Sequence, residues 1–173
     1  MRADAADMPA RASRTLVVGV GSTIRGDDGV GPVVAAEVCA RGGDGFEALV
    51  FDGSALDLLT AMAGGPAADR LVVIDCMATG KLAEGDVARL VVPPSDGDPG
   101  FLSSHHAGIL ELHAMARRLS CPLPADVRCY AVGVRDATAF REGLGDALAA
   151  AVPSIARAIL KDLGAAGSAG ESP

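Results

Sequence analysis

The sequence predicts a single α/β domain of three layers, in which a mostly parallel, twisted, five-stranded sheet carries helices on both faces. Apolar runs of strand length alternate with longer amphipathic segments, and this alternation is typical of a parallel sheet covered by helices. The run RLVVID at 70–75 has an unbroken apolar centre, as expected of a strand that is buried on both faces. The chain has 173 residues, half of them apolar, which suits one domain with a substantial core.

The individual elements follow from these patterns in chain order. We expect strands at 15–19, 48–51, 70–75, 87–92 and 127–134. We expect helices at 28–40, 56–63, 104–119 and 136–163. Because an internal proline removes one hydrogen bond of a helix, Pro153 predicts two helices in the last range rather than one. Residues 1–13 and 164–173 have loop composition, so we predict one domain at 14–163 between disordered ends.

The composition argues against several classes of function. The net charge is −7 and there is no basic cluster, which disfavours nucleic acid and anionic membranes as partners. No apolar run reaches the roughly 20 residues of a membrane span, and residues 1–14 lack the apolar stretch of a signal peptide. The four cysteines show no C-x-x-C spacing, so neither a thiolate zinc site nor a disulfide framework is indicated. We expect a cytoplasmic protein that acts as a monomer and binds neither nucleic acid nor membrane.

A glycine-rich loop after the first predicted strand is the most informative segment of the chain. Gly21 and Gly26 have the spacing of a phosphate-binding loop, but Asp27 and Asp28 stand where that motif requires Lys and Ser or Thr. The dinucleotide-binding fingerprint also fails, because Ile24 occupies the position of its third glycine. Two carboxylates repel a polyphosphate and attract a cation or a proton. The loop therefore predicts a metal site or an acid–base site.

Further polar residues are expected at the same edge of the sheet. Asp28 follows the first predicted strand, Asp52 follows the second, and Asp75 ends the third. His105 lies in the segment that enters the helix after the fourth strand. In an open parallel sheet, ligands bind beyond the carboxyl ends of the strands, where successive helices diverge to opposite faces. Two carboxylates and an imidazole suit Ni²⁺, Zn²⁺ or Mn²⁺ and leave coordination positions open for water or substrate.

Each of these residues also has a structural interpretation. Asp28 can favour a helix N-terminus through the helix dipole, and Asp75 can form a turn after its strand. Arg25 is either a simple loop charge or a group that holds a substrate carboxylate. Cys76 is a nucleophile or, more typically, a buried cysteine at a strand end. For Asp27, His106 and His113, a structural or solvent-exposed role is more frequent than a role as a metal ligand.

Five segments of the chain resemble the [NiFe]-hydrogenase maturation endopeptidases, and the resemblance covers about residues 15–163. The matching segments fall in the family's order, and they are VGVG at 18–21, RGDDGVG at 25–31, DGS at 52–54, VVID at 72–75 and SHHAG at 104–108. The block GDDGVG is the most specific of them. The resemblance implies a twisted sheet between helices. It also implies a hydrolase, classified with the aspartic-type peptidases, that removes a short C-terminal peptide from the hydrogenase large-subunit precursor once nickel is inserted.

The resemblance further implies roles for single residues. Asp28, Asp75 and His105 would contact the metal, which is nickel carried by the substrate, with another divalent metal such as zinc as the alternative in isolation. Asp28, Asp52 and Asp75 would be the catalytic carboxylates, and Asp52 holds an acidic position associated with activity in the family. The spacing to Gly108 favours His105 over its neighbour His106. Ser22 stands where family members commonly have asparagine.

Two other functions remain compatible with the same residues. One is a small-molecule metallohydrolase that uses the same crevice. The other is a non-catalytic, metal-dependent chaperone that binds the precursor without cutting it.

Overall fold

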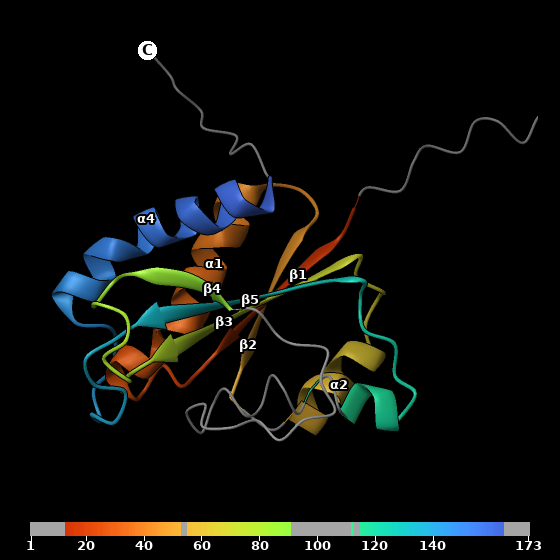
Figure 1. Ribbon diagram of the computed structural model, residues 1–173, viewed down its shortest axis with the longest axis horizontal. Helices are drawn as coiled ribbons and strands as arrows, with labels where there is room; N and C mark the ends of the chain where they lie inside the picture. The colour runs from red at the N-terminus through yellow and green to blue at the C-terminus, as the bar shows by residue number, and fades with distance from the viewer. Residues whose placement is uncertain (1–12, 53–54, 91–111, 113–114, 165–173) are drawn as a thin grey trace, which may run out of the picture.

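The computed structural model describes residues 13–52, 55–90, 112 and 115–164, and these residues form a five-stranded sheet with helices on both sides (Figure 1). The strands stand in the order β2-β1-β3-β5-β4. Their bounds are Thr15–Val20 (β1), Phe46–Phe51 (β2), Arg70–Met77 (β3), Val87–Leu90 (β4) and Asp126–Gly133 (β5). Four strands are parallel, and β4 runs antiparallel to β5. The predicted mostly parallel sheet is confirmed, and the last two residues of the strand predicted at 87–92 lie outside the described residues.

Helices cover both faces of this sheet. A short 3₁₀ helix at Gly26–Gly29 leads directly into α1 (Val30–Gly42), and α2 (Ala55–Ala63) and α4 (Asp146–Leu163) follow. Figure 1 shows α1 and α4 together on one side of the sheet and α2 on the other. Most of the helix predicted at 104–119 lies outside the described residues, within which 112 and 115–118 are helical.

The two central strands are buried on both faces because their side chains alternate between two apolar clusters. Odd-numbered Val17 of β1 joins the cluster under α1 and α4, whereas its neighbours Leu16 and Val18 join the cluster under α2. The same alternation divides Val72 from Val73 in β3. A period of two along a strand directs successive side chains to opposite faces, so a continuous apolar run fills both layers of core, as the sequence predicted.

The strand order places a topological switch point between β1 and β3. From β1 the chain crosses through α1 to β2 at one edge, and from β2 it crosses through α2 to β3 on the other side of β1. Because parallel crossovers are right-handed, connections that run in opposite directions place their helices on opposite faces. The crossovers on the two sides of β1 therefore lie on opposite faces of the sheet, and ligands of such sheets bind beyond the carboxyl ends of the strands at that position, here β1 and β3.

The C-terminal helix is uninterrupted, so the prediction of two helices around Pro153 was wrong. Pro153 lies inside α4, where its missing N–H and its ring cost about 3 kcal/mol. The apolar stripe of α4 continues on both sides of the proline and joins the core under α1. Burying one large apolar side chain contributes roughly 1.5–3 kcal/mol, so the whole stripe outweighs the proline. Its buried members are Leu148, Val152, Ile155, Ala156, Ile159, Leu160 and Leu163.

The segment predicted as the first part of that helix, from 136 onward, is a loop instead. The Oδ1 atom of Asp136 accepts hydrogen bonds from the backbone N–H and the hydroxyl of Thr138, at 2.7 and 2.6 Å. Such an Asp turn competes with helix formation. Gly143 has a φ of +78°, which a right-handed helix does not contain. The helix therefore begins only at Asp146.

Membrane-spanning helices were not expected from the hydropathy of the sequence. In the part of the chain that the structure describes, no helix is both long and apolar enough to cross a membrane.

Candidate active site

Asp28 and Asp75 lie at the switch point of the sheet, and both are buried. Asp28 belongs to the 3₁₀ helix that follows the β1 loop, and its exposed fraction is 2%. Asp75 is the sixth residue of β3, and its exposed fraction is 0%. Carboxylates are rarely buried to this degree unless they are hydrogen-bonded or have a functional role. The site therefore consists of two acidic groups withdrawn from solvent at the expected ligand position.

Residue Cys76 connects the two carboxylates. Its backbone N–H donates to Asp75 Oδ1 at 2.7 Å, and its thiol Sγ donates to Asp28 Oδ1 at 3.4 Å. The second oxygen of Asp28, Oδ2, accepts the backbone N–H of Ser22 at 2.8 Å. Since this bond comes from the backbone, it does not depend on the Ser22 side chain, where the related family commonly has asparagine. Asp28 is thus held from both sides by bonds to β3 and to its own loop.

The Cys76 thiol is a hydrogen-bond donor in this arrangement and not a nucleophile. Burial raises its pKa far above the usual range, and the nearby negative charges of Asp75 and Asp28 raise the pKa further. The reactive form of cysteine is the thiolate, and this environment opposes its formation. Of the two interpretations that the sequence left open, the geometry favours the structural one.

The pKa values of Cys39, Cys129 and Tyr130, which are buried or partly buried, are raised in the same way, and this sets an expected pH dependence of stability. Burial raises the pKa of Cys39 to about 11 and that of Cys129 to about 12, from an ordinary value of 9.0. Burial and the hydrogen bond to Asp162 also raise the pKa of Tyr130. In the unfolded chain these groups lose their protons at lower pH than in the folded chain, so the stabilisation is complete below pH 9.0 and is lost as pH rises through 11 and 12.

We therefore expect the free energy of unfolding to fall steadily above about pH 9. Urea denaturation under reducing conditions at about pH 8, pH 9.5 and pH 10.5 measures this slope. Cys39→Ala is the matched variant, because it removes one of the groups and makes the slope shallower. A free energy of unfolding that stays constant over this range contradicts the assignment.

Asp27 has a structural role and connects the β1 loop to the far end of the chain. Its Oδ1 atom accepts the backbone N–H of Gly145 at 2.8 Å and Arg141 Nη2 at 3.0 Å. The backbone N–H of Gly26 donates to the Arg141 carbonyl at 2.7 Å, and residues 25 and 141 form a parallel β-bridge. Asp27 was expected to be solvated or to cap a helix, but it is buried, with an exposed fraction of 7%. The contact with 141–145 fixes the loop that carries Asp28.

Glycines in this segment are required because backbones approach one another closely. A Cβ atom at Gly21 would lie 2.0 Å from the Asp28 carbonyl oxygen, and Gly21 has a φ of +127°, which disfavours other residues. A Cβ atom at Gly31 would lie 2.2 Å from the Val20 carbonyl oxygen and 2.6 Å from that of Ile74. The start of α1 therefore contacts the ends of β1 and β3 directly. This contact explains why Asp27 and Asp28 are embedded in a glycine-rich block.

Comparison with solved structures gives several matches over most of the chain. The hydrogenase maturating endopeptidase HybD from E. coli is 22% identical, with a TM-score of 0.59, over 87% of this chain and 91% of that one. The [NiFe] hydrogenase maturation protease HybD from Thermococcus kodakarensis is 20% identical, with a TM-score of 0.62, over 87% and 98%. The endopeptidase HycI from Escherichia coli is 18% identical, with a TM-score of 0.60, over 92% and 99%. No protein-family model and no curated protein matches the chain.

The chain has the fold of the [NiFe]-hydrogenase maturation proteases. The resemblance inferred from the short motifs is thus confirmed at the level of the fold. Three of those motifs, at 18–21, 25–31 and 72–75, lie where β1 and β3 meet the start of α1.

The remaining predicted site residues lie at the edge of this arrangement or outside the described part. Asp52 follows β2 directly and is exposed, so it is not part of the buried pair, although it lies at the same end of the sheet as Asp28. His105, His106 and His113 lie outside the described residues. Within the described residues, no group of three His, Cys, Asp or Glu side chains is arranged to hold a metal ion. Of the residues predicted to contact a metal, Asp28 and Asp75 lie in the described part of the chain.

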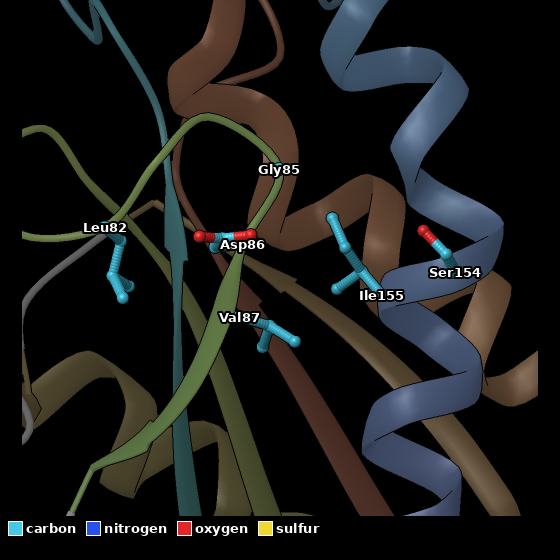
Figure 2. A pocket seen from close by; sticks show the side chains of 6 residues that line it. All are labelled: Leu82, Gly85, Asp86, Val87, Ser154 and Ile155. Atoms are coloured by element: carbon cyan, nitrogen blue, oxygen red, sulfur yellow. The ribbon is translucent and has the colours of Figure 1, made fainter.

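A pocket of about 340 Å³ lies between the start of β4 and α4 and contains none of the predicted site residues. Figure 2 shows its lining, with Asp86 and Val87 on the strand side and Ser154 and Ile155 on the helix side. Among the described residues of this lining, only Asp86 is ionisable. The described part of this lining therefore lacks a pair of buried carboxylates such as Asp28 and Asp75.

Two features of the site were not found from the sequence. The first is that the backbone N–H of Cys76 donates to Asp75 and its thiol donates to Asp28. The second is the set of hydrogen bonds from Arg141 and Gly145 to Asp27. The cysteine was visible as the neighbour of Asp75. The bonds of Asp27 span more than a hundred residues, and no local pattern predicts such a pair.

Proposed function

We propose that this chain is an endopeptidase that removes the C-terminal extension of a [NiFe]-hydrogenase large-subunit precursor after nickel insertion. The observation that carries the proposal is the buried pair Asp28 and Asp75 at the switch point of a maturation-protease fold. Three proteins that share this fold are named maturation proteases or endopeptidases. The four free cysteines of the chain suit the reducing cytoplasm in which we place the reaction.

In this proposal the nickel ion is part of the substrate, and the chain recognises it through Asp28, Asp75 and His105. Carboxylate oxygens and an imidazole nitrogen are suitable donors for Ni²⁺, and also for Zn²⁺ in its absence. Asp28 is oriented by the Ser22 N–H and the Cys76 thiol, and Asp75 by the Cys76 N–H. Recognition by preoriented groups makes cleavage conditional on a loaded precursor and holds the scissile bond close to the same carboxylates.

The same carboxylates supply the chemistry that an aspartic-type peptidase needs. A carboxylate that is withdrawn from water and held in one orientation can accept a proton from an attacking water and return it to the leaving nitrogen. Asp28 and Asp75 are buried and oriented in this way. Asp52 lies in solvent at the same end of the sheet, and we assign it an accessory role in orienting the substrate.

The test is the intact mass of a purified precursor, with and without nickel, after incubation with the full-length chain. We expect the loss of a short C-terminal peptide only from the nickel-loaded precursor. Running the same assay with His105→Ala and His106→Ala identifies the histidine that contributes, and His113→Ala is the control.

Other outcomes of this assay identify the competing functions. A loaded precursor that keeps its mass contradicts the endopeptidase. If that precursor remains bound to the chain, the result favours a metal-dependent chaperone. Turnover of a model amide or ester by the metal-loaded chain alone favours a small-molecule metallohydrolase.

A further inference from the structure

The turn that carries Asp28 has few internal bonds to hold its shape. It is a 3₁₀ helix of four residues, Gly26–Gly29, and within the described residues its N-cap, Arg25, makes no side-chain capping bond. Both ends of the turn are glycines, which restrict the backbone least. The hydrogen bonds of a 3₁₀ helix also have poorer geometry than those of an α-helix. Contacts from outside the turn therefore contribute to fixing its conformation.

Hydrogen bonds from the segment between β5 and α4 supply such contacts. The Gly26 N–H donates to the Arg141 carbonyl at 2.7 Å. Asp27 Oδ1 accepts hydrogen bonds from Arg141 Nη2 at 3.0 Å and from the Gly145 N–H at 2.8 Å. The last two bonds meet at one oxygen of the residue that directly precedes Asp28. A shift of Asp27 would therefore move Asp28 with it.

Charge as well as hydrogen bonding holds the Asp27 carboxylate in this position. Gly145 is the residue before α4, so the carboxylate lies at the N-terminal end of that helix, where the helix dipole favours a negative charge. The Arg141 guanidinium is a second positive group beside it. The side chain of Asp27 is 10% exposed, whereas that of Arg141 is 51% exposed. Loss of the guanidinium would leave a nearly buried carboxylate with weaker compensation, which favours conformations that expose it.

The backbone N–H of Ser22 reports how Asp28 is oriented. It donates to Asp28 Oδ2 at 2.8 Å, and Ser22 is itself buried. Exchange of this amide hydrogen with solvent requires that the bond to Asp28 opens. A change in the exchange rate of the Ser22 amide therefore measures a change in how firmly the Asp28 carboxylate is held, without reference to any substrate.

We propose that Arg141 and Asp27 are positioning residues, which hold the Asp28 carboxylate in place from a segment 114 positions further along the chain. Neither side chain needs to touch the substrate in this role. The expected effect on cleavage rests on the proposed function, because it takes Asp28 to be a catalytic carboxylate. A misplacement of about 1 Å can slow an enzymatic reaction about a hundred-fold, so a partial loosening of Asp28 slows cleavage by a smaller factor.

The experiment compares substitutions of Arg141 in the full-length chain. Arg141→Met removes the charge and keeps an aliphatic stem, whereas Arg141→Lys keeps a charge that can pair with Asp27. Arg135→Met is the matched control, because Arg135 lies in the same connecting segment but pairs with Glu84 at 2.9 Å. We expect Arg141→Met to speed exchange of the Ser22 amide roughly ten-fold and to lower kcat for the nickel-loaded precursor roughly ten-fold. Arg141→Lys should recover most of both, and Arg135→Met should stay close to the wild type.

A second substitution tests whether Arg141 acts through Asp27. In Asp27→Asn the side-chain oxygen can still accept the Gly145 N–H, but it no longer carries a charge for Arg141. If the two residues act as one unit, the double variant Asp27→Asn with Arg141→Met loses no more activity than the weaker of the two single variants. Losses that multiply in the double variant would overturn the pairing.

Folding stability separates positioning from a general structural role. Because the Arg141 side chain is half-exposed, its ion pair contributes little to global stability, so the urea midpoint of Arg141→Met should stay close to that of the wild type. A fall in kcat that only follows the fraction of unfolded chain would overturn the proposal. So would equal effects of Arg135→Met and Arg141→Met.

The positioning proposal and the proposed function can fail separately. If the wild type cuts the loaded precursor and Arg141→Met keeps either the wild-type kcat or the wild-type exchange of the Ser22 amide, positioning is overturned while the endopeptidase stands. If the wild type cuts no loaded precursor, the proposed function fails. Faster exchange of the Ser22 amide in Arg141→Met, but not in Arg135→Met, would then still support the positioning of Asp28.

Discussion

The Asp75→Asn variant is expected to cleave the nickel-loaded precursor at least about a hundred-fold more slowly than the wild type, with no loss of folding stability. Asn has nearly the shape of Asp, and its side-chain oxygen can still accept the Cys76 N–H that Asp75 Oδ1 accepts at 2.7 Å. The substitution therefore removes the negative charge and keeps the local hydrogen bond. Because Asp75 is fully buried, a neutral amide is no more costly there than a charge.

The separation of activity from stability is what distinguishes a functional carboxylate from a structural one. Cleavage is followed by intact mass, and the free energy of unfolding is measured by urea denaturation. Asp44→Asn is the matched control, since Asp44 is exposed in the loop that precedes β2 at the opposite end of the sheet. Wild-type cleavage by Asp75→Asn would remove Asp75 from the proposed mechanism, whatever its effect on stability.

Gly31→Ala should strongly destabilise the fold, with an expected loss of roughly 3 kcal/mol or more in the free energy of unfolding. The added Cβ would lie 2.2 Å from the Val20 carbonyl oxygen and 2.6 Å from the Ile74 carbonyl oxygen. Both obstacles are backbone atoms of central strands, so neither can move aside as a flexible side chain would. The start of α1 would have to move away from the sheet, and Asp28 would move with it.

Urea denaturation of Gly31→Ala and of the control Gly64→Ala tests whether close backbone approach causes the loss of stability. Gly64 lies just after α2, and a Cβ atom there would come no closer than 3.7 Å to another atom. We expect Gly64→Ala to change the free energy of unfolding by less than about 1 kcal/mol. Equal effects of the two substitutions would show that close backbone approach is not the reason for glycine at position 31.

The sequence predicted the structure of a segment correctly where one physical cause determines that structure. The run at 70–75 is apolar because its strand is buried on both faces, and the structure places β3 at the centre of the sheet. The position of Asp28 and Asp75 followed from the general rule on strand ends, and the two carboxylates do lie on either side of Cys76. Their roles, and those of Asp52 and His105, stay predictions.

The sequence predicted the structure less well where local preferences compete with contacts between distant residues. Pro153 predicts a helix break when α4 is considered alone, but the buried stripe on both sides of it holds the helix together. The residues from 136 to 145 have helix-compatible composition in part, yet the turn at Asp136 and the bonds of Asp27 to Arg141 and Gly145 determine their conformation. Such a partner cannot be identified in one sequence, because nothing near Asp27 specifies it.

The bond between Asp27 and Gly145 also sets the order in which the active centre can assemble. The two residues are 118 positions apart, so a ribosome completes the loop that carries Asp28 long before it makes the segment that fixes this loop. Strands β1, β2 and β3 can pair while that segment is still missing. The loop that carries Asp28 therefore gains these contacts only after residues 141–145 have been made. A fragment that stops before residue 141 retains Asp28 and Asp75. It lacks the contacts of Asp27 with Arg141 and Gly145 that fix the loop carrying Asp28.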